Sequence, residues 1–477
     1  MLSNARTRNR SRFLVNTTLV NGILFLTLYS KRMKVWKFGG TSVGKPERMH
    51  SVAQLITQDG ERKIVVLSAV SGTTNSLVEI GNLMYKEDKP AATQVIDRLY
   101  QSYQEFVRQL YASKTGKQQG NAIIAAHFDF IRSFATQPFT QKEEKELLAE
   151  GELISTQLFQ AYMEEIGVRS VLLPALDFMK IDADDEPDLK FTEKALGDLV
   201  KQHAQATILL TQGYICRNPS GEVDNLKRGG SDYTASLVGA AIRAQEVQIW
   251  TDIDGMHNND PRIVKHTFPI AELSFDEAAE LAYFGAKILH PFSIRPAKRY
   301  NIPVRLLNTM QPDARGTLIT NEVAETGEGD IKAIAAKDGI IAIKIQSSRM
   351  LLAYGFLRRV FEIFEKFKTP IDMITTSEVA ISLTIDNPTN LEKIVHELST
   401  FGTVEVDRDQ SIVCVVGNLG FEKQGLALSI FQALRHIPLR MISYGGSNHN
   451  VSILIHSSHK NEALNALNEG LFKFENA

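Results

Sequence analysis

The chain has 477 residues, which is long enough for two or more domains. With 43% hydrophobic residues, 23% charged residues and a formal net charge of −2, it has an ordinary globular composition and no electrostatic reason to bind nucleic acid. The two cysteines, Cys216 and Cys414, offer neither a metal-binding spacing nor a disulfide framework, which favours a reducing cytoplasm as the location.

Residues 1–32 differ from the rest of the chain. They are rich in Lys and Arg, no acidic residue precedes Glu47, and residues 19–29 are mostly apolar. Such a segment is either a targeting peptide or an over-extended start. We favour the over-extended start, because Met33 directly precedes the first predicted strand and no small-residue cleavage site follows the apolar run. No other stretch approaches the ~20 apolar residues of a membrane span, so no membrane partner is expected.

From Met33 to about residue 310, short apolar runs alternate with helical patterns. Several runs are apolar throughout, which is typical of strands covered by helices on both faces. A long helical stretch from about residue 91 to 167 interrupts the alternation. This pattern predicts an α/β domain, whose first strand ends at Lys37. The further strands expected in it are 63–68, 171–173, 207–211, 247–250 and 302–307.

Two glycine loops lie far apart in this region, at Lys37–Ser42 and Arg228–Asp232, and each leads into a helical pattern. Backbone N–H groups at a helix start, together with the helix dipole, favour an anion such as phosphate. Neither loop has the P-loop or the dinucleotide-binding spacing. Lys37 and Arg228 add positive charge, so two anions could be held side by side, which suggests phosphoryl transfer between small molecules.

The polar segment 321–330 reads as a linker, and the pattern changes after it. Two units follow, from residue 339 to about 407 and from residue 411 to about 474, each with a strand, a helix and a further strand. The second strands are expected over 371–378 and 439–447. The similar phrases Pro370–Thr375 and Pro438–Ser443 occupy corresponding places, so this is an internal repeat of about 70 residues.

Six motifs now appear in the order found in aspartate kinases. They are Lys37–Ser42, Glu150–Ser155, Arg228–Ala235, Trp250–Gly255, Asp260–Arg262 and Phe284–Pro291. The tail resembles the paired ACT regulatory domains of the lysine-sensitive monofunctional form of these enzymes. The resemblance implies an amino-acid-kinase fold, an open and mainly parallel sheet sandwiched by helices, followed by two α+β ACT domains. The implied boundaries are 1–32 for the extension, 33–320 for the kinase domain, 321–337 for a linker and a strand that joins the second ACT unit, 338–408 for the first ACT unit and 409–477 for the second.

The resemblance implies phosphorylation of the side-chain carboxylate of L-aspartate by ATP, giving 4-aspartyl phosphate, the first step towards lysine, threonine and methionine. A carboxylate nucleophile is already ionised at neutral pH, so no general base is required. Mg²⁺ is expected to arrive with ATP and to keep phosphate and water ligands. No protein metal site is expected, since the segment 252–255 lacks the remaining ligands of a calcium loop.

The resemblance also assigns roles to individual residues. Thr74 and Ser231 have an alternative reading as ordinary helix N-caps. His257 stands where related enzymes usually carry Tyr, which leaves any nucleotide contact of that ring open. The implied catalytic residues are Lys37 and Asp232; the substrate-binding residues are Thr74, Glu152, Arg228 and Ser231; and the ATP-binding residues are Lys37, Gly39, Gly40, Thr251, Asp252, His257, Arg262 and Lys287.

For regulation, the resemblance implies feedback inhibition by L-lysine at the first ACT unit and a homodimer formed through the ACT domains. A helix start can receive the effector's carboxylate, while Asp372 and Glu378 can receive its ammonium groups. Packing of the ACT core is the alternative role for the three apolar residues of the set. Residues 352–354 are less polar than in the family, which leaves the effector's identity open. The implied effector residues are Met350, Phe356, Leu357, Asp372, Thr376, Ser377 and Glu378.

Two other functions remain open on the sequence. Another amino-acid kinase of the same fold is disfavoured by the Phe284–Pro291 motif and by the tandem tail. A catalytically silent amino-acid sensor is disfavoured because Lys37, Arg228, Asp232 and Lys287 are all present.

Overall fold

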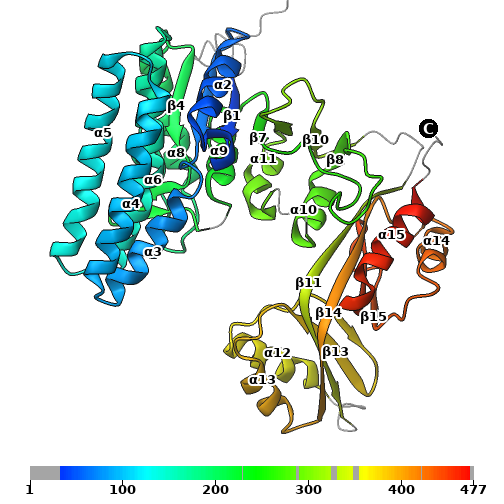
Figure 1. The fold of residues 1–477 in the computed structure, drawn as a ribbon. Coiled ribbons are helices and arrows are strands. Elements are labelled where there is room, and N and C mark those ends of the chain that lie inside the picture. The colour runs from blue at the N-terminus through cyan, green and yellow to red at the C-terminus, as the bar shows by residue number, and fades with distance from the viewer. Residues whose placement is uncertain are drawn as a thin grey trace, which may run out of the picture. The chain divides into compact units, whose positions relative to one another are not determined.

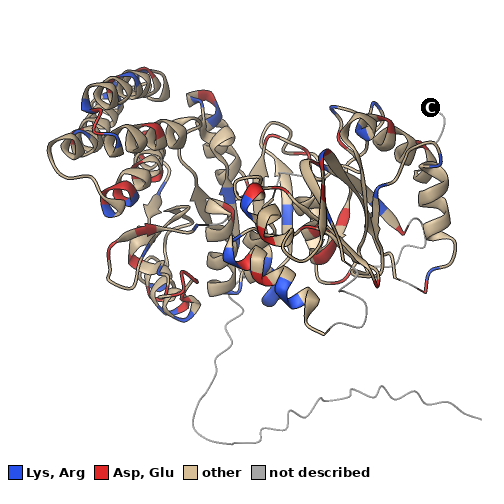
Figure 2. Ribbon diagram, turned by 90° about the horizontal axis from the view of Figure 1, so that it is seen from below, with Lys and Arg blue, Asp and Glu red and all other residues tan. Residues whose placement is uncertain are grey.

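The structure is a computed structural model that describes residues 33–227, 229–285, 289–323, 330–347, 354–420 and 422–472 (Figure 1). The segment 1–32, interpreted above as an over-extended start or a targeting peptide, lies outside the described residues. Residues 33–477 form a compact unit of their own. Within the described part, no helix is long and apolar enough to cross a membrane. The ribbon of Figure 2 shows acidic and basic residues intermingled along the elements in view, in keeping with the small net charge.

The half that is expected to be catalytic, residues 33–320, is called the catalytic half. It is built on an eight-stranded sheet in which neighbouring strands are parallel, except that the pair β9 and β10 is antiparallel. In sheet order the strands are β3 (Ser170–Leu172), β4 (Ile208–Gln212), β2 (Lys63–Leu67), β1 (Lys34–Phe38), β7 (Val247–Thr251), β9 (Val304–Asn308), β10 (Thr317–Thr320) and β8 (Glu272–Ser274). Every residue of β2 and of β4 is buried, as their apolar runs predict, and the burial extends to the polar residues Lys63, Thr211 and Gln212. The α/β class is therefore confirmed. The short strands β8 and β10 have no counterpart among the predicted strands.

The central sheet separates two hydrophobic cores. On β2, for example, Ile64 and Val66 belong to one core, and Val65 and Leu67 belong to the other. This alternation follows from the two-residue period of a strand. One core includes residues of α7 (Ala175–Phe178), α8 (Leu189–Gln202), α9 (Gly230–Ile242) and α10 (Phe275–Tyr283), and the other includes residues of α2 (Pro46–Thr57) and α3 (Thr73–Tyr85).

The helical stretch between residues 91 and 167 consists of three long helices, α4 (Lys89–Leu110), α5 (Lys114–Ser133) and α6 (Gln141–Glu165). Together with α3 they pack side by side, as Figure 1 shows. The break before α6 carries a capping box, in which Thr140 and Glu143 exchange side-chain and backbone hydrogen bonds. The remaining elements of this half are α1 (Gly40–Val43), η1 (Phe134–Thr136), the hairpin β5 (Ile215–Arg217) and β6 (Val223–Asn225), η2 (Pro291–Ile294) and α11 (Arg295–Arg299).

The half that follows residue 330, which is expected to be regulatory, contains one six-stranded antiparallel sheet. Its order is β12 (Ile374–Thr376), β13 (Ala380–Ile385), β11 (Ile331–Gln346), β14 (Thr403–Gly417), β16 (Asn450–His456) and β15 (Met441–Ser443). Helices α12 (Phe356–Lys366) and α13 (Leu391–Leu398) pack in one core, and α14 (Leu426–Ala433) and α15 (Lys460–Leu471) pack in another; η4 (Ser457–His459) precedes α15. The strands expected over 371–378 and 439–447 are much shorter than predicted, at three residues each.

The two repeats share their central strands. Ile331 at the start of β11 pairs with Gly417 at the end of β14, and Gln346 pairs with Thr403, so both long strands run through both repeats. The boundaries expected at 337/338 and 408/409 therefore fall inside continuous strands. Both strands have a residue with positive φ at this point, Gly339 at +75° and Asp409 at +56°, and the register of the pair shifts there.

Candidate active site

Lys37 and Asp232 meet at the carboxyl end of the central sheet. Lys37 is the next-to-last residue of β1 and Asp232 is in the first turn of α9, and Lys37 Nζ lies 2.6 Å from Asp232 Oδ1. Both side chains are largely buried, with exposed fractions of 12% and 16%. In open α/β sheets ligands bind at this end of the strands. The pair therefore places an ammonium group, oriented by a carboxylate, where a ligand would bind.

Glycines let the backbone approach closely around this pair. A Cβ on Gly39 would lie 3.4 Å from Lys37 Nζ, and a Cβ on Gly40 would lie 3.1 Å from the carbonyl oxygen of Ala69. Gly229 is the N-cap of α9 with φ of +72°, so neither Thr74 nor Ser231 is an N-cap residue: the N-cap of α3 is Gly72. This excludes the N-cap alternative for both residues.

The hydroxyl of Ser231 joins the ends of β2 and β4 to α9. Ser68 Oγ donates a hydrogen bond to Ser231 Oγ at 2.9 Å, and Ser155 Oγ of α6 donates to the carbonyl oxygen of Ser68 at 2.9 Å. A Cβ on Gly213 would lie 2.2 Å from Ser231 Oγ. Ser68, Ser155 and Gly213 were not predicted as site residues. A polar residue that directly follows an apolar run, as Ser68 follows residues 64–67 of β2, is the signal that could have identified one of them.

Glu152 is a buried carboxyl group on α6. Its Oε1 accepts a hydrogen bond from the backbone N–H of Ala69 at 3.3 Å, and its Oε2 is buried without a partner among the described residues. Burial raises the pKa of Glu152 to about 8, although the N–H of Ala69 and the charge of Lys37 oppose the shift. Burial, followed by the charge of Glu152, also raises the pKa of Tyr214 to about 12. A buried carboxyl group with a free oxygen is suited to receive the ammonium group of a ligand.

The two remaining residues expected at the substrate are Thr74 and Arg228. Thr74 is in the first turn of α3 and is exposed, whereas its neighbour Thr73 is buried. Arg228 lies outside the described residues.

The expected nucleotide residues follow strand β7. Thr251 ends this strand and donates a hydrogen bond to the carboxylate of Asp252 at 3.1 Å. Thr309, which follows β9, donates its backbone N–H to the carbonyl oxygen of Thr251 at 2.8 Å, and its hydroxyl is 2.7 Å from that of Ser42 in α1. Thr309 and Ser42 thus connect β7, β9 and the first glycine loop, although neither was predicted.

The other residues expected at the nucleotide are His257, Arg262 and Lys287. Both ring nitrogens of His257 are engaged, with Nε2 2.8 Å from Asp254 and Nδ1 3.1 Å from Thr267. The side chain of Arg262 is 84% exposed, and its guanidinium binds both carboxylate oxygens of Asp260, at 2.9 and 2.7 Å. Lys287 lies outside the described residues.

The expected effector residues are divided between core and surface. Phe356 is buried and packs edge-on against Phe401, with ring centroids 5.6 Å apart. Its alternative role in the ACT core is therefore the one that the structure shows, whereas Leu357 is 41% exposed. Thr376, Ser377 and Glu378 are exposed. Met350 lies outside the described residues.

Asp372 is paired within the chain through one carboxylate oxygen, whereas its Oδ2 is buried without a partner among the described residues. Its side chain is 2% exposed, and its Oδ1 accepts hydrogen bonds from Tyr283 Oη at 2.7 Å and from Lys337 Nζ at 2.9 Å. Lys337 Nζ also pairs with Asp386 at 2.9 Å and lies 4.4 Å from the centroid of the Tyr283 ring. An effector ammonium at Asp372 therefore either competes with Lys337 for Oδ1 or binds the unpartnered Oδ2.

Comparisons with known proteins agree with this architecture. The amino acid kinase family matches residues 32–308, and an ACT domain family matches residues 413–471. Aspartokinase 3, chloroplastic, from Arabidopsis thaliana is 35% identical over 467 residues, which cover 92% of this chain and 81% of that protein. Lysine-sensitive aspartokinase 3 from Escherichia coli (strain K12) is 32% identical over 452 residues, which cover 92% of this chain and 99% of that protein.

Solved structures give the same result. The crystal structure of E. coli aspartokinase III in complex with aspartate and ADP superposes with a TM-score of 0.78 at 31% identity, covering 92% of this chain and all of that chain (100%). The structure of the same protein in complex with lysine and aspartate superposes with a TM-score of 0.76, also at 31% identity and with the same coverage.

Proposed function

Since the chain belongs to the aspartokinases of the amino acid kinase family, we propose that the Lys37, Asp232 and Glu152 cluster transfers the γ-phosphoryl group of ATP to the side-chain carboxylate of L-aspartate. The observation that carries this proposal is the buried carboxyl of Glu152 beside the Lys37–Asp232 pair. The charge of Lys37 acts on this carboxyl and opposes the rise of its pKa. An amino-acid substrate supplies the ammonium group that Glu152 lacks, while Lys37 neutralises charge on the transferring group.

In the proposed reaction, an oxygen of the aspartate side chain forms a bond to the γ-phosphorus as the bond from that phosphorus to the bridging oxygen of ADP breaks. The nucleophile is ionised at neutral pH, so the protein has to position it and to stabilise negative charge. Asp232 holds the Lys37 ammonium in place. Arg228, Ser231 and Thr74 are proposed to bind the substrate with Glu152, on the basis of their motif positions.

The nucleotide is proposed to bind beside the ends of β1 and β7. Gly39 and Gly40 leave room for close approach of a phosphate, and Thr251 and Asp252 follow β7. Arg262, Lys287 and His257 are kept as proposed contacts; for His257 the contact requires that a ring already bonded to Asp254 and Thr267 also faces the nucleotide. Mg²⁺ is proposed as part of the Mg–ATP substrate complex, in which it keeps mostly phosphate and water ligands.

The test of this function is an assay of ATP consumption that depends on aspartate, with hydroxylamine to trap the acyl phosphate as a hydroxamate. We expect a hydroxamate from L-aspartate and none from L-glutamate or N-acetylglutamate. Hydroxamate formation with glutamate would support another kinase of the same fold. Binding of amino acids without ATP turnover would support a silent sensor.

We propose that L-lysine inhibits the enzyme by binding at the first ACT unit. Asp372 supports this choice of unit, because the corresponding place in the second unit is held by Arg440, whose guanidinium pairs with Asp407 at 2.8 Å. Only the first unit therefore offers a carboxylate at this position for a cationic effector. The solved relative with bound lysine supports lysine as the effector.

We also propose a homodimer formed through the ACT units, in a reducing cytoplasm. Leu357 and Phe361 are large exposed apolar side chains spaced four residues apart on α12, and Leu428 on α14 is 69% exposed. Exposed apolar surface of this kind favours a protein partner. Light scattering behind gel filtration should give a mass near twice that of the chain, and a monomer at micromolar concentration would contradict the proposal.

The proposed location is a reducing cytoplasm. The unpaired cysteines Cys216 and Cys414 are in keeping with reducing conditions.

A further inference from the structure

A hydrogen bond between two buried hydroxyl groups lies near Glu152, the proposed partner of the substrate ammonium. Tyr103 Oη on α4 and Thr73 Oγ1 at the start of α3 are 2.8 Å apart, and the two residues are 3% and 2% exposed. The ring of Tyr103 packs against Phe128 and Phe106, with centroids 5.7 and 6.2 Å away. The ring therefore has its own packing partners, and the hydroxyl makes a separate polar contact with α3.

Thr73 belongs to the segment 69–74, which also makes a hydrogen bond to Glu152 of α6. The N–H of Ala69, at the start of the segment, is the hydrogen-bond donor to Glu152 Oε1. The neighbouring Gly151 is in close contact with the same segment, since a Cβ there would lie 2.9 Å from Ala69 Cβ and 3.4 Å from Thr73 Cγ2. A shift of the segment would therefore move the N–H group that orients the Glu152 carboxyl.

The segment is not packed solidly on its other side. A cavity of about 390 Å³ is lined by Val70, Ser71, Gly72 and Thr73 together with residues of α3 and α4, Tyr103 among them. Gly72 has φ of +87°, a left-handed conformation that glycine adopts without strain. Next to a cavity and a permissive glycine, the Tyr103–Thr73 hydrogen bond is a specific contact that fixes the segment relative to α4.

We propose that Tyr103 is a positioning residue for aspartate binding, which acts through Thr73 on the segment 69–74 and thereby on the Glu152 carboxyl. The inference rests on the proposed function, because Glu152 is the proposed partner of the aspartate ammonium. In this proposal Tyr103 acts through Thr73 and not by contact with either substrate. Its effect should therefore be on the affinity for aspartate and not on the affinity for ATP.

The test compares Tyr103→Phe with Tyr111→Phe. The control residue Tyr111 is also buried in the helical layer, at 1% exposed, but its hydroxyl donates to the carbonyl oxygen of Leu158 at 2.7 Å. Both variants keep the ring and lose one buried hydrogen bond, so both should lose similar stability. We expect only Tyr103→Phe to raise the KM for aspartate, by about three- to tenfold, the loss that one ordinary hydrogen bond corresponds to, with an unchanged KM for ATP and a smaller change in kcat.

A second variant tests the route through Thr73. Thr73→Val removes the other partner of the hydrogen bond, and it should raise the KM for aspartate to a similar extent. The double variant Tyr103→Phe, Thr73→Val should be no worse than the worse single variant, because both changes break one contact. Independent, additive effects would overturn the route through Thr73.

Two outcomes separate this inference from the proposed function. If the unmodified protein forms no hydroxamate from aspartate, the proposed function fails. If it does, but Tyr103→Phe leaves the KM for aspartate unchanged or raises it no more than Tyr111→Phe does, the positioning role is overturned while the function stands.

Discussion

Lys37 is the residue on which the proposed chemistry depends most. Its ammonium, held by Asp232, should stabilise charge that develops only during transfer. We therefore expect Lys37→Ala to lower kcat by about 10² or more, with a smaller effect on either KM. Lys34→Ala is the matched control, since Lys34 lies on the same strand and pairs instead with Glu61. Steady-state kinetics would remove Lys37 from the catalytic set if its variant kept a near-normal kcat.

Glu152 gives the site a dependence on pH. With its pKa raised to about 8 by burial, the free enzyme holds this carboxyl mostly neutral at pH 7, whereas the aspartate ammonium requires it to be ionised. We expect the KM for aspartate to fall as pH rises from 6 to about 8, by at most about tenfold per pH unit. The KM for ATP should change less. In Glu152→Gln, which cannot ionise, aspartate should bind weakly and this pH dependence should disappear.

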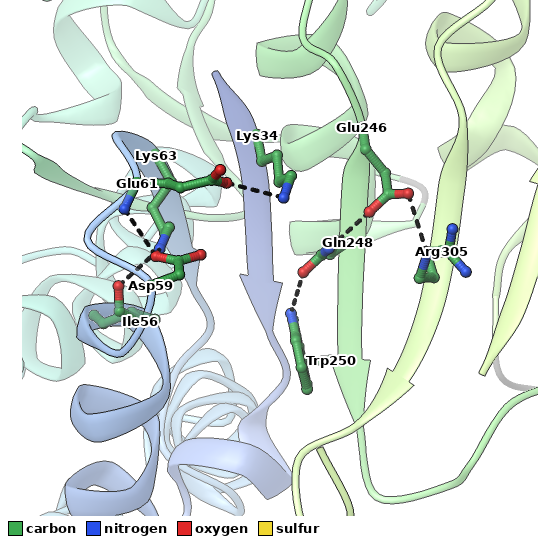
Figure 3. Close-up of polar contacts among 9 residues, drawn as sticks. All are labelled: Lys34, Ile56, Asp59, Glu61, Lys63, Glu246, Gln248, Trp250 and Arg305. Carbon is green, nitrogen blue, oxygen red and sulfur yellow. Dashed lines mark hydrogen bonds and ion pairs between the residues drawn. The ribbon is translucent and has the colours of Figure 1, made fainter. Parts of the chain in front are cut away.

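At the scale of the element, the amino ends of the strands in the catalytic sheet are fixed by polar contacts (Figure 3). Lys63, the first residue of β2, is fully buried: it pairs with Asp59, donates to the carbonyl oxygen of Ile56 at 2.9 Å and lies 4.4 Å from the Trp36 ring centroid. Its ammonium is therefore paired and hydrogen-bonded, as a buried charge requires. This cluster lies at the amino ends of the strands, whereas Lys37 lies at the carboxyl ends.

Loss of one partner of this pair should cost stability without affecting catalysis. We expect Asp59→Asn to lower the free energy of unfolding at pH 7 by about 1–2 kcal/mol, less than for a fully buried pair because Asp59 is one-third exposed. Lys63→Met, which removes the buried charge itself, should cost less than Asp59→Asn. Denaturant unfolding would measure both, and equal losses would contradict this account.

The same pair predicts a loss of stability in acid. Burial alone would raise the pKa of Asp59, but hydrogen bonds from Lys63 and from the Glu61 backbone lower it below its ordinary value. A carboxyl whose pKa is lowered by folding stabilises the protein above its unfolded pKa, about 3.9, and this stabilisation is lost as pH falls through the lower folded value. The difference between the unmodified protein and Asp59→Asn should therefore shrink below about pH 4.

For the whole molecule, helix α10 is an element of the catalytic half that contacts both ACT units. Glu277 pairs with Lys332 of β11 at 3.1 Å, Glu280 accepts hydrogen bonds from Ser447 and Asn450, and Tyr283 donates to Asp372. These three residues are spaced three apart and so lie along one side of the helix. The chain then passes directly into the Phe284–Pro291 motif, where Gly285 packs on the backbone of Ala336.

This arrangement predicts that Tyr283 couples the effector to catalysis. An effector must bind one state more tightly than another, and Asp372 is shared between the effector proposed here and Tyr283. Asp372→Asn should raise the lysine concentration for half-inhibition at least tenfold, and Tyr283→Phe should weaken inhibition while leaving kcat without lysine within about twofold. Tyr85→Phe is the control, because the hydroxyl of Tyr85 donates a hydrogen bond to Glu144 on an exposed face. Inhibition by threonine alone, or lysine inhibition unchanged in both variants, would contradict the assignment.

The sequence by itself determined the strands and the loops that bear the proposed catalytic residues. Apolar runs such as the one that forms β2, and glycine loops such as the one that begins α9, depend on local sterics and on burial of successive residues, which a sequence pattern carries directly. The order of the motifs is likewise read directly from the chain, so it was sufficient to recognise the family.

Only the tertiary structure decided which of these residues meet. Glu152 and Ala69 are 83 positions apart, and Tyr103 and Thr73 are 30 apart on different helices, so their contacts depend on how α3, α4 and α6 pack. The continuity of β11 through both repeats and the pairing of Asp372 with Lys337 depend likewise on strand register. Packing and register are set by the whole chain at once, which is why no local pattern reveals them.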